Sequence, residues 1–205
     1  MKDIANTPLV SIICSTYNHG LYISQCLDGF LMQKTNFPFE ILIHDDASTD
    51  NTPDIIREYE HNQPQVIRPI YQKENKYSKK EDIFAKYQCS RVRGKYIAIC
   101  EGDDYWIDPL KLQKQIDFLE NNPDYGMIYT TSKVYNQKEG KIEEDIIGRE
   151  FNGYIELLSG NCIPTLTTCI RSSLVMEYLK EVEPKSKNWL MGDYPMWLWI
   201  SYITK

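Results

Sequence analysis

Short apolar runs alternate with amphipathic stretches along the first half of the chain. Four runs are short and apolar enough for buried parallel strands, and they cover residues 9–14, 39–44, 66–71 and 96–100. Between and after these runs, apolar residues recur at helical spacing. The spacing predicts helices over 23–31, after Asp50 or Thr52, over about 82–91 and after Asp108. This alternation indicates an α/β fold in which helices cover both faces of a mostly parallel sheet.

The pattern changes after residue 122. We expect strands over 126–135 and 165–171, a polar turn at 136–141, a helix over 172–183, a polar loop at 184–188 and a last helix from Asp193. Neither a repeat nor a linker divides the sequence, so residues 1–205 are expected to form one domain. In this interpretation 8–125 build the main site, and 126–205 add specificity elements around it.

Composition and charge narrow the class of protein. The 205 residues are 42% apolar, enough for a sizeable core, and the net charge of −6 argues against a general nucleic-acid binder. The six cysteines are scattered, and the chain start lacks the apolar core of a secretion signal. We therefore expect free thiols in a reducing cytoplasm. Apolar runs also fall short of the ~18–20 residues that span a membrane.

Polar clusters follow three of the predicted strands, at 15–18, 45–50 and 101–106. In a parallel sheet these clusters emerge at one edge, where ligands bind. Asp103 and Asp104 suit a hard divalent cation such as Mg²⁺ or Mn²⁺. Alternatively, they cap the next helix or face solvent. Asp50 is expected to be a helix cap, and His44 a structural group at the end of its strand.

Segment 73–95 is basic in an acidic chain, with eight Lys or Arg residues against three acidic ones. A basic segment that leads into the strand before Asp103 and Asp104 suits a diphosphate ligand. A solvated helix face is the alternative interpretation. Neither a phosphate-binding Walker loop, nor a glycine-rich dinucleotide loop, nor a nucleophile elbow is present.

The order of these segments resembles the family 2 glycosyltransferases of the GT-A fold. Residues 10–18 resemble the opening strand of the family with its Thr-Tyr-Asn end, and 40–50 its second strand with the Asp-Asp-x-Ser-Thr-Asp loop. Residues 94–104 resemble its metal-binding Asp-x-Asp region, here in a Gly-Asp-Asp form. Residues 191–194 lie where the family places a late acidic base. The resemblance is good over 8–125 and looser beyond, and it implies a three-layer α/β/α sandwich.

The resemblance also implies roles for individual residues. Asp46 would pair with the nucleobase, expected to be uracil, Asp103 would contact the ribose or sugar, and Asp104 would ligate Mg²⁺ or Mn²⁺. The nucleotide pocket would be lined by Ser15, Thr16 and Tyr17, and the acceptor hydroxyl would be deprotonated by Asp193. Many members carry Ala-Arg-Asn before the fourth strand, where this chain reads Phe-Ala-Lys-Tyr at 84–87. The donor-binding arginine is therefore expected to be replaced by Lys79, Lys80 or Lys86.

The implied reaction is inverting sugar transfer from a nucleotide-diphosphate-sugar, expected to be a UDP-sugar, to a glycan or lipid-linked saccharide. It would serve bacterial cell-surface polysaccharide or glycan biosynthesis in the cytoplasm, with peripheral association at the inner face of the membrane. The alternatives are a nucleotidyltransferase, which needs more glycines than the single one in 15–20, and a non-catalytic nucleotide-sugar-binding domain.

Two further expectations concern the end of the chain. Aromatic residues there either stack on an acceptor sugar or fill the core or an interface; they are Trp189, Tyr194, Trp197 and Trp199. Family members usually continue with elements that close the acceptor site. The chain is therefore expected to be the catalytic core of a longer protein, truncated at its C-terminal side.

Overall fold

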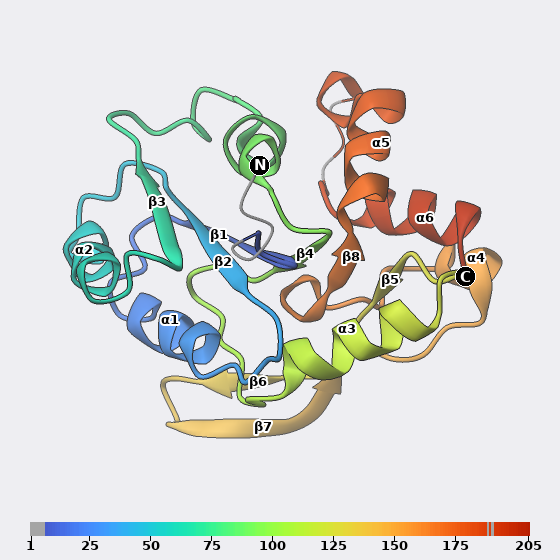
Figure 1. Cartoon of the computed structure of the whole chain (residues 1–205), viewed down its shortest axis with the longest axis horizontal. Helices are drawn as coiled ribbons and strands as arrows, with labels where there is room; N and C mark the ends of the chain where they lie inside the picture. Colours follow the sequence, from blue (N-terminus) through green and yellow to red (C-terminus); the bar gives the residue numbers. More distant parts are fainter. Residues whose placement is uncertain (1–6, 188, 190) are drawn as a thin grey trace.

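A six-stranded sheet forms the centre of the computed structural model, which describes residues 7–187, 189 and 191–205. Its strand order is β3-β2-β1-β4-β8-β5 (Figure 1). The first four strands in this order run parallel, β8 is antiparallel to β4, and β5 is antiparallel to β8. Their bounds are β1 (Val10–Thr16), β2 (Phe39–Asp45), β3 (Ile67–Tyr71), β4 (Tyr96–Ile99), β5 (Met127–Ile128) and β8 (Cys169–Arg171).

Helices cover both faces of this sheet and give three layers. One face packs against α1 (Ile23–Leu31), α2 (Thr52–Asn62) and α3 (Lys111–Asn121). The other packs against α4 (Gly153–Leu157), α5 (Ser172–Val182) and α6 (Tyr194–Ile203), on the opposite side of the sheet in Figure 1. Alternate strand residues point to opposite faces, so Ile12 joins the first core and Ile13 the second. The predicted three-layer α/β fold is confirmed.

The helix predicted over about 82–91 is present, but it is not a regular α-helix. This segment forms a π-helical turn, Phe84–Gln88, followed by a 3₁₀ turn, Cys89–Arg91. The wider turn places Tyr87 between two partners: its ring lies 5.2 Å from that of His44, and its hydroxyl donates to Glu81 at 2.7 Å. His44 is fully buried and its pKa is lowered by that burial, which fits its predicted structural role.

Two predicted strands are shorter than expected. The run over 126–135 divides into β5 and β6 (Ser132–Asn136), which belong to different sheets. The run over 165–171 begins with a 3₁₀ turn, Thr165–Thr167, and only its end is β8. Side-chain hydrogen bonding accounts for this, because the Thr167 hydroxyl accepts from the Thr130 amide and has the Thr130 and Pro164 carbonyls, both at 2.8 Å, as alternative acceptors for its one proton. Such bonds compete with the sheet ladder.

A separate hairpin joins β6 to β7 (Lys141–Ile147) and runs beneath α1 and α3 in Figure 1. The polar turn between them was predicted, whereas β7 and α4 were not. Three consecutive acidic residues in β7, at 143–145, break the alternation of apolar and polar positions that identifies a strand. The Tyr22 hydroxyl donates to Gln137 at 3.0 Å and ties the hairpin to the start of α1.

Other expectations are tested by the described residues. All six cysteines are free thiols, and five of them are buried. Within the described part of the chain, none of the helices has the length and apolarity needed to cross a bilayer. Residues 1–6, 188 and 190, which belong to the expected domain and to the polar loop at 184–188, lie outside the described residues.

At the amino ends of the strands, a buried carboxylate joins β1, β2 and the turn before β4. Glu40 is 1% exposed and accepts from the Ser11 hydroxyl at 2.7 Å and from Arg93 Nε at 2.9 Å. The Ser11 oxygen accepts in turn from the Gly94 amide at 3.0 Å. A buried charge is tolerated when it is paired and hydrogen-bonded in this way. The network therefore fixes the amino edge of the sheet.

Glu40→Ala is expected to lower the free energy of unfolding by about 2–3 kcal/mol, because buried Ser11 loses its acceptor and Arg93 its partner. Urea denaturation measures this change. The control is Lys114→Ala, which removes an exposed ion pair with Asp108 and should cost less than about 1 kcal/mol. Equal effects of the two substitutions would contradict the structural role of Glu40.

The first turn of α3 contains a buried lysine. Lys111 is 7% exposed, its Nζ donates to Gln115 Oε1 at 2.8 Å, and it lies 4.0 Å from the centroid of the Trp106 ring. Burial lowers the pKa of Lys111 to about 8, against smaller opposing effects of Cys169 and Cys100. The folded protein thus releases this proton at lower pH than an unfolded chain does, where a lysine has a pKa of about 10.4.

Between pH 8 and about 10 the unfolded chain holds a proton that the folded protein has lost, so Lys111 makes the free energy of unfolding rise with pH. We expect this free energy in the wild type to rise relative to that of Lys111→Met by about 2–3 kcal/mol over this range. Denaturant titrations at several pH values check this. Parallel pH profiles of the two proteins would exclude a lowered Lys111 pKa.

Candidate functional site

The loops after β1 and β2 lie side by side at the carboxyl edge of the sheet and are joined by hydrogen bonds. Asn18 Oδ1 accepts from the Thr49 amide at 2.8 Å. One oxygen of Asp50 accepts from the Gly20 amide and the other from the Thr52 amide, both at 2.9 Å. The second bond satisfies an otherwise unpaired donor at the start of α2, although the N-cap position itself is Asn51, one residue after the expected Asp50.

An acidic cluster follows β4 at the same edge. Glu101, Asp103 and Asp104 each offer a carboxylate oxygen, and these oxygens lie within 4.8 Å of one another. His19 Nδ1, from the loop after β1, lies 3.8 Å from Asp103 Oδ1. Three carboxylates match the oxygen ligands that Mg²⁺ and Mn²⁺ prefer. These residues are therefore suited to hold such an ion.

Gly102 lets the acidic cluster approach the loop after β1. Its amide donates to the Ser15 carbonyl at 2.9 Å. A Cβ at this position would lie 2.7 Å from Thr16 Oγ1 and 3.0 Å from His19 Nδ1, so a side chain would push the two loops apart. Both of these atoms are buried and lack a hydrogen-bond partner in the described part of the protein. They are polar groups that a ligand at this edge can satisfy.

The electrostatics of the acidic cluster favour a bound cation. Burial and the negative charge of Asp103 raise the pKa of Asp104 to about 6, and His19 opposes this rise. Loss of hydration raises the pKa of Glu101, and the charges of Asp103, Asp104 and Asp193 raise it further. Carboxylates in such mutual repulsion are relieved by a positive charge placed among them.

Asp46 anchors the basic segment that follows β3. It is 3% exposed, and its two carboxylate oxygens accept from the backbone amides of Lys76 at 2.7 Å and Tyr77 at 3.0 Å. Its own amide donates to the Thr16 carbonyl at 3.0 Å. Each carboxylate oxygen retains a second acceptor position. Asp46 therefore lies beside the predicted nucleotide pocket but already has a structural function there.

The other predicted donor-binding residues differ in placement. Thr16 is buried, whereas Ser15 is half-buried and Tyr17 is 44% exposed. Lys79 and Lys86 are exposed, and their ammonium groups pair with Glu74 and Glu81 of the same segment. The structure thus brings Ser15 and Thr16 to the acidic cluster but directs these two lysines to neighbouring glutamates.

Asp193 lies at the N-terminus of α6 and caps it, as its sequence position predicts. Its Oδ1 accepts from the Tyr194 amide at 2.7 Å, and its Oδ2 accepts from the Thr165 hydroxyl. Thr165, which donates to Asp193, directly precedes Leu166, whose carbonyl accepts from the indole of Trp106, two residues after Asp104. Chain segments separated by about ninety residues therefore place carboxylates at one edge of the fold.

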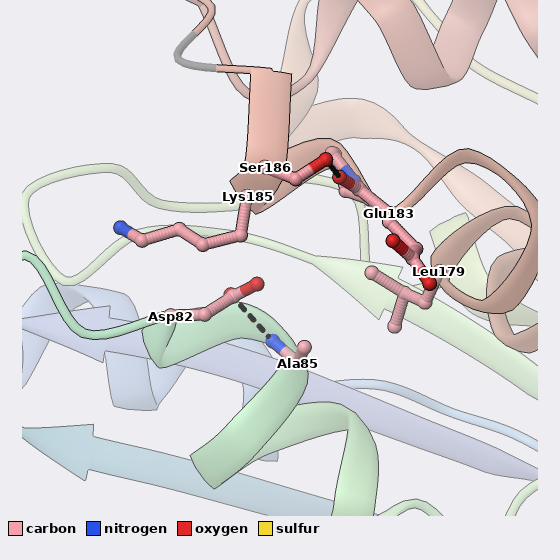
Figure 2. A pocket seen from close by; sticks show the side chains of 7 residues that line it. Asp82, Ala85, Leu179, Glu183, Lys185 and Ser186 are labelled. Carbon is pink, nitrogen blue, oxygen red and sulfur yellow. Dashed lines mark hydrogen bonds between the residues drawn. The ribbon is translucent and has the colours of Figure 1, made fainter.

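A shallow hollow of about 470 Å³ lies away from this edge cluster, between the π-helical turn and the end of α5 (Figure 2). Figure 2 shows the Asp82 carboxylate directed at the Ala85 amide, which donates to it at 2.9 Å. Lys185 extends from the opposite wall, and its Nζ donates to the Glu81 carbonyl at 3.5 Å. This hollow joins the basic segment to the segment that leads to Asp193.

The aromatic residues near the end of the chain have different roles. Trp197 is fully buried in the second core, so stacking on an acceptor is excluded for it. Tyr194 is half-buried and donates to the Leu157 carbonyl at 2.7 Å. The half-buried Trp199 and the exposed Trp189 line an aromatic hollow of about 430 Å³ between α4, α5 and α6. These two remain open to a ligand or a partner.

Sequence reasoning missed three groups of this site. Glu101 belongs to the polar cluster predicted at 101–106 but was not predicted to be a metal ligand. Its position directly after a strand was the signal that could have identified it. His19 belongs to no sequence pattern with the spacing of metal ligands. Thr165 lies 28 residues before Asp193 along the chain. Only the three-dimensional structure shows that it contacts that residue.

Comparison with known proteins shows the family to which the chain belongs. The chain matches the model of Glycosyl transferase family 2 over residues 11–178. It is 43% identical over 137 residues to the uncharacterized protein Rv1520 of Mycobacterium tuberculosis. The aligned region covers 66% of this chain and 38% of that protein. It is 30% identical over 163 residues to the putative teichuronic acid biosynthesis glycosyltransferase TuaG of Bacillus subtilis, covering 80% and 62%. The chain thus spans less than two thirds of the length of these relatives.

Solved structures agree in fold. S. aureus TarS 1-349 superposes with a TM-score of 0.64 at 20% identity, over 95% of this chain and 55% of the TarS 1-349 chain. Its complex with UDP-GlcNAc superposes with a TM-score of 0.63 at 21% identity, over 85% of this chain and 47% of that chain. The mannosyltransferase PcManGT from Pyrobaculum calidifontis, in complex with GDP-Man and Mn²⁺, gives 0.58 at 20% identity, over 83% and 46%. Sequence match and shared fold together show that the chain belongs to the family 2 glycosyltransferases and has their GT-A fold.

Proposed function

We propose that this chain transfers a sugar from a nucleotide-diphosphate-sugar, a UDP-sugar in the first instance, to an acceptor hydroxyl with inversion at the anomeric carbon. One observation supports the proposal above all. The turn Thr165–Thr167 joins the acidic cluster to Asp193, because the Thr165 hydroxyl donates to Asp193 and the Leu166 carbonyl accepts from Trp106, two residues after Asp104. A donor held by the cluster would lie between the two.

We assign metal binding to Asp104, with Asp103 beside it contacting the ribose or sugar and Glu101 completing the set of carboxylates. Mg²⁺ or Mn²⁺ bound there would neutralise the charge that develops on the departing nucleoside diphosphate. The mutual repulsion of these carboxylates and the pKa of about 6 at Asp104 favour such an ion. The Mn²⁺ in the PcManGT complex is consistent with this assignment.

The nucleotide would bind over the loops after β1 and β2. Ser15, Thr16 and Tyr17 would line the pocket, and the free Thr16 hydroxyl is a polar group ready for a ligand. Asp46 would accept from the base with its remaining lone pairs while it holds the basic segment. UDP-GlcNAc bound to TarS supports a uridine donor. Lys79 and Lys86 would need to leave their glutamate partners to reach the diphosphate.

Asp193 would act as the general base. In a single displacement, the acceptor oxygen forms a bond to the anomeric carbon while the bond from that carbon to the diphosphate oxygen breaks. The acceptor proton passes to the Asp193 carboxylate, and the nucleoside diphosphate leaves with the bonding electron pair. At the N-terminus of α6, the Asp193 carboxylate accepts from the Tyr194 amide, which orients it.

The biological setting that we propose is the synthesis of cell-surface polysaccharide in a bacterium. The acceptor would be a glycan or a lipid-linked saccharide reached from the cytoplasmic side of the membrane. Relatives named for teichuronic acid biosynthesis and for glucosyl transfer to GlcNAc-diphosphoundecaprenol support this setting. An acceptor that is embedded in the membrane would require only peripheral association of the chain.

Asp104→Asn is expected to weaken Mn²⁺ binding in the presence of UDP by more than ~10-fold, because it removes a charged ligand. Loss of a residue that only supports a metal ligand already weakens binding by about that factor. Isothermal titration calorimetry with Mn²⁺ and UDP measures this. The matched control is Asp117→Asn on the exposed face of α3, which should bind as the wild type does. An unchanged affinity in Asp104→Asn would refute the metal assignment.

Asp193→Asn is expected to lower kcat by roughly 10²–10⁴-fold and to leave the KM for the donor unchanged, because asparagine caps a helix as well as aspartate but cannot take a proton. Transfer is measured with the UDP-sugar that gives the largest thermal stabilisation in a screen with Mn²⁺. Full activity of Asp193→Asn would place the base elsewhere. Donor binding by the wild type without transfer or donor hydrolysis would favour a non-catalytic binding domain.

A further inference from the structure

The 3₁₀ turn Thr165–Thr167 lies between the acidic cluster and Asp193. It is hydrogen-bonded to Asp193 and to residues that follow the acidic cluster in the chain. Its three residues each make a hydrogen bond to a different element. Its outgoing end is fixed to the sheet, because the Thr168 carbonyl accepts from the amide of Ile99, the last residue of β4. The turn is thus attached to the strand from which the acidic cluster emerges.

On one side, the turn holds the loop that carries the acidic cluster. Trp106 lies two residues after Asp104, and its indole Nε1 donates to the Leu166 carbonyl at 2.7 Å. The Trp106 ring is 4% exposed and packs edge-on against Phe30 of α1, with the ring centroids 4.8 Å apart. Gly29 makes room for it, since a Cβ there would lie 2.9 Å from the Trp106 backbone.

The start of α3 reinforces the same contact. Lys111 lies over the Trp106 ring and donates to Gln115, and the Gln115 side-chain amide donates in turn to the Thr167 carbonyl at 2.8 Å. Two consecutive carbonyls of the turn therefore accept from the chain that follows the acidic cluster, Leu166 from Trp106 in the loop and Thr167 from Gln115 in α3. Buried side-chain networks in which every member is bonded restrict the geometry of the elements that they join.

On the other side, the turn holds Asp193. The Thr165 hydroxyl donates to Asp193 Oδ2, while Asp193 Oδ1 accepts from the Tyr194 amide. Each oxygen of this carboxylate thus has a donor, and the two donors fix the plane of the carboxylate relative to α6. The remaining lone pairs of these oxygens are available to a substrate proton.

We propose that the turn Thr165–Thr167 sets the position of Asp193 relative to the acidic cluster, with Thr165 and Trp106 as positioning residues. This inference rests on the proposed function, in which Asp193 takes the acceptor proton and the cluster holds the donor diphosphate. A displacement needs the base, the acceptor oxygen and the anomeric carbon in line, and an error of about 1 Å can cost 10²-fold in rate. Neither residue touches the donor in this scheme.

The test compares Thr165→Val, which removes the hydroxyl at nearly constant volume, with Thr165→Ser, which keeps it. For Thr165→Val we expect kcat to fall about 10–100-fold, the effect typical of losing a group that orients a ligand, with the KM for the donor and the affinity for Mn²⁺ within twofold of wild type. Thr165→Ser should keep most of the activity. Thermal melting of each variant shows whether it is folded.

Two further measurements separate positioning from a structural role. In the Asp193→Asn background, Thr165→Val should cause no additional loss of kcat, because Thr165 acts through Asp193. Trp106→Phe keeps the ring but removes the indole N–H, and it should lower kcat about 10-fold. In the double variant with Thr165→Val, the fold-loss of kcat should be smaller than the product of the two single losses, because both residues act through one turn.

Some results would overturn the inference alone. The first is full activity of Thr165→Val. The second is an equal loss of kcat in Thr165→Val and Thr165→Ser. The third is a loss of kcat from Thr165→Val that is as large in the Asp193→Asn background as in the wild type. In each of these cases Asp193→Asn remains inactive and the proposed function stands. Full activity of Asp193→Asn would instead refute the base assignment, and the turn would lose its proposed role with it.

Discussion

Repulsion among carboxylates held at one edge of the sheet is the constraint on which the rest of the site depends. Glu101, Asp103 and Asp104 have oxygens within 4.8 Å of one another, and Asp193 adds a further negative charge within reach. Such a cluster persists only if the backbone around it is fixed by other interactions. The loops after β1 and β2 are hydrogen-bonded to each other, Gly102 packs against the first of them, and the Glu40 network holds the opposite ends of the same strands.

The sequence was sufficient for the parts of the fold that repeat locally. Buried parallel strands are continuous apolar runs, so β1, β2 and β4 were predicted nearly to their ends, and the polar residues after them indicated the edge where ligands bind. The two shortened strands share a feature that the sequence does not show. The Thr167 hydroxyl is hydrogen-bonded to the backbone of Thr130, 37 residues away, at the turn that precedes β8. A hydropathy pattern contains no information about such a partner.

The site shows the same division between local and distant information. Asp103, Asp104 and Asp193 could be proposed because each lies at the end or the start of a predicted element and matches a family motif. The contact of Thr165 with Asp193 and that of Trp106 with Leu166 could not, because neither pair shares a motif or a spacing. The lysines show what a count of charges leaves out. Their charge indicates a phosphate site, and the structure adds that Lys79 and Lys86 are paired with glutamates of the same segment.

The position of β8 in the sheet has a consequence for how the protein folds. This strand pairs with β4 on one side and β5 on the other, although it follows them by about 70 and 40 residues in the chain. During synthesis, the edge of β4 therefore stays unpaired until residue 171 has left the ribosome, and an unpaired apolar edge invites association with other chains. The nascent chain passes through an aggregation-prone interval that ends only when its second half supplies the missing strand.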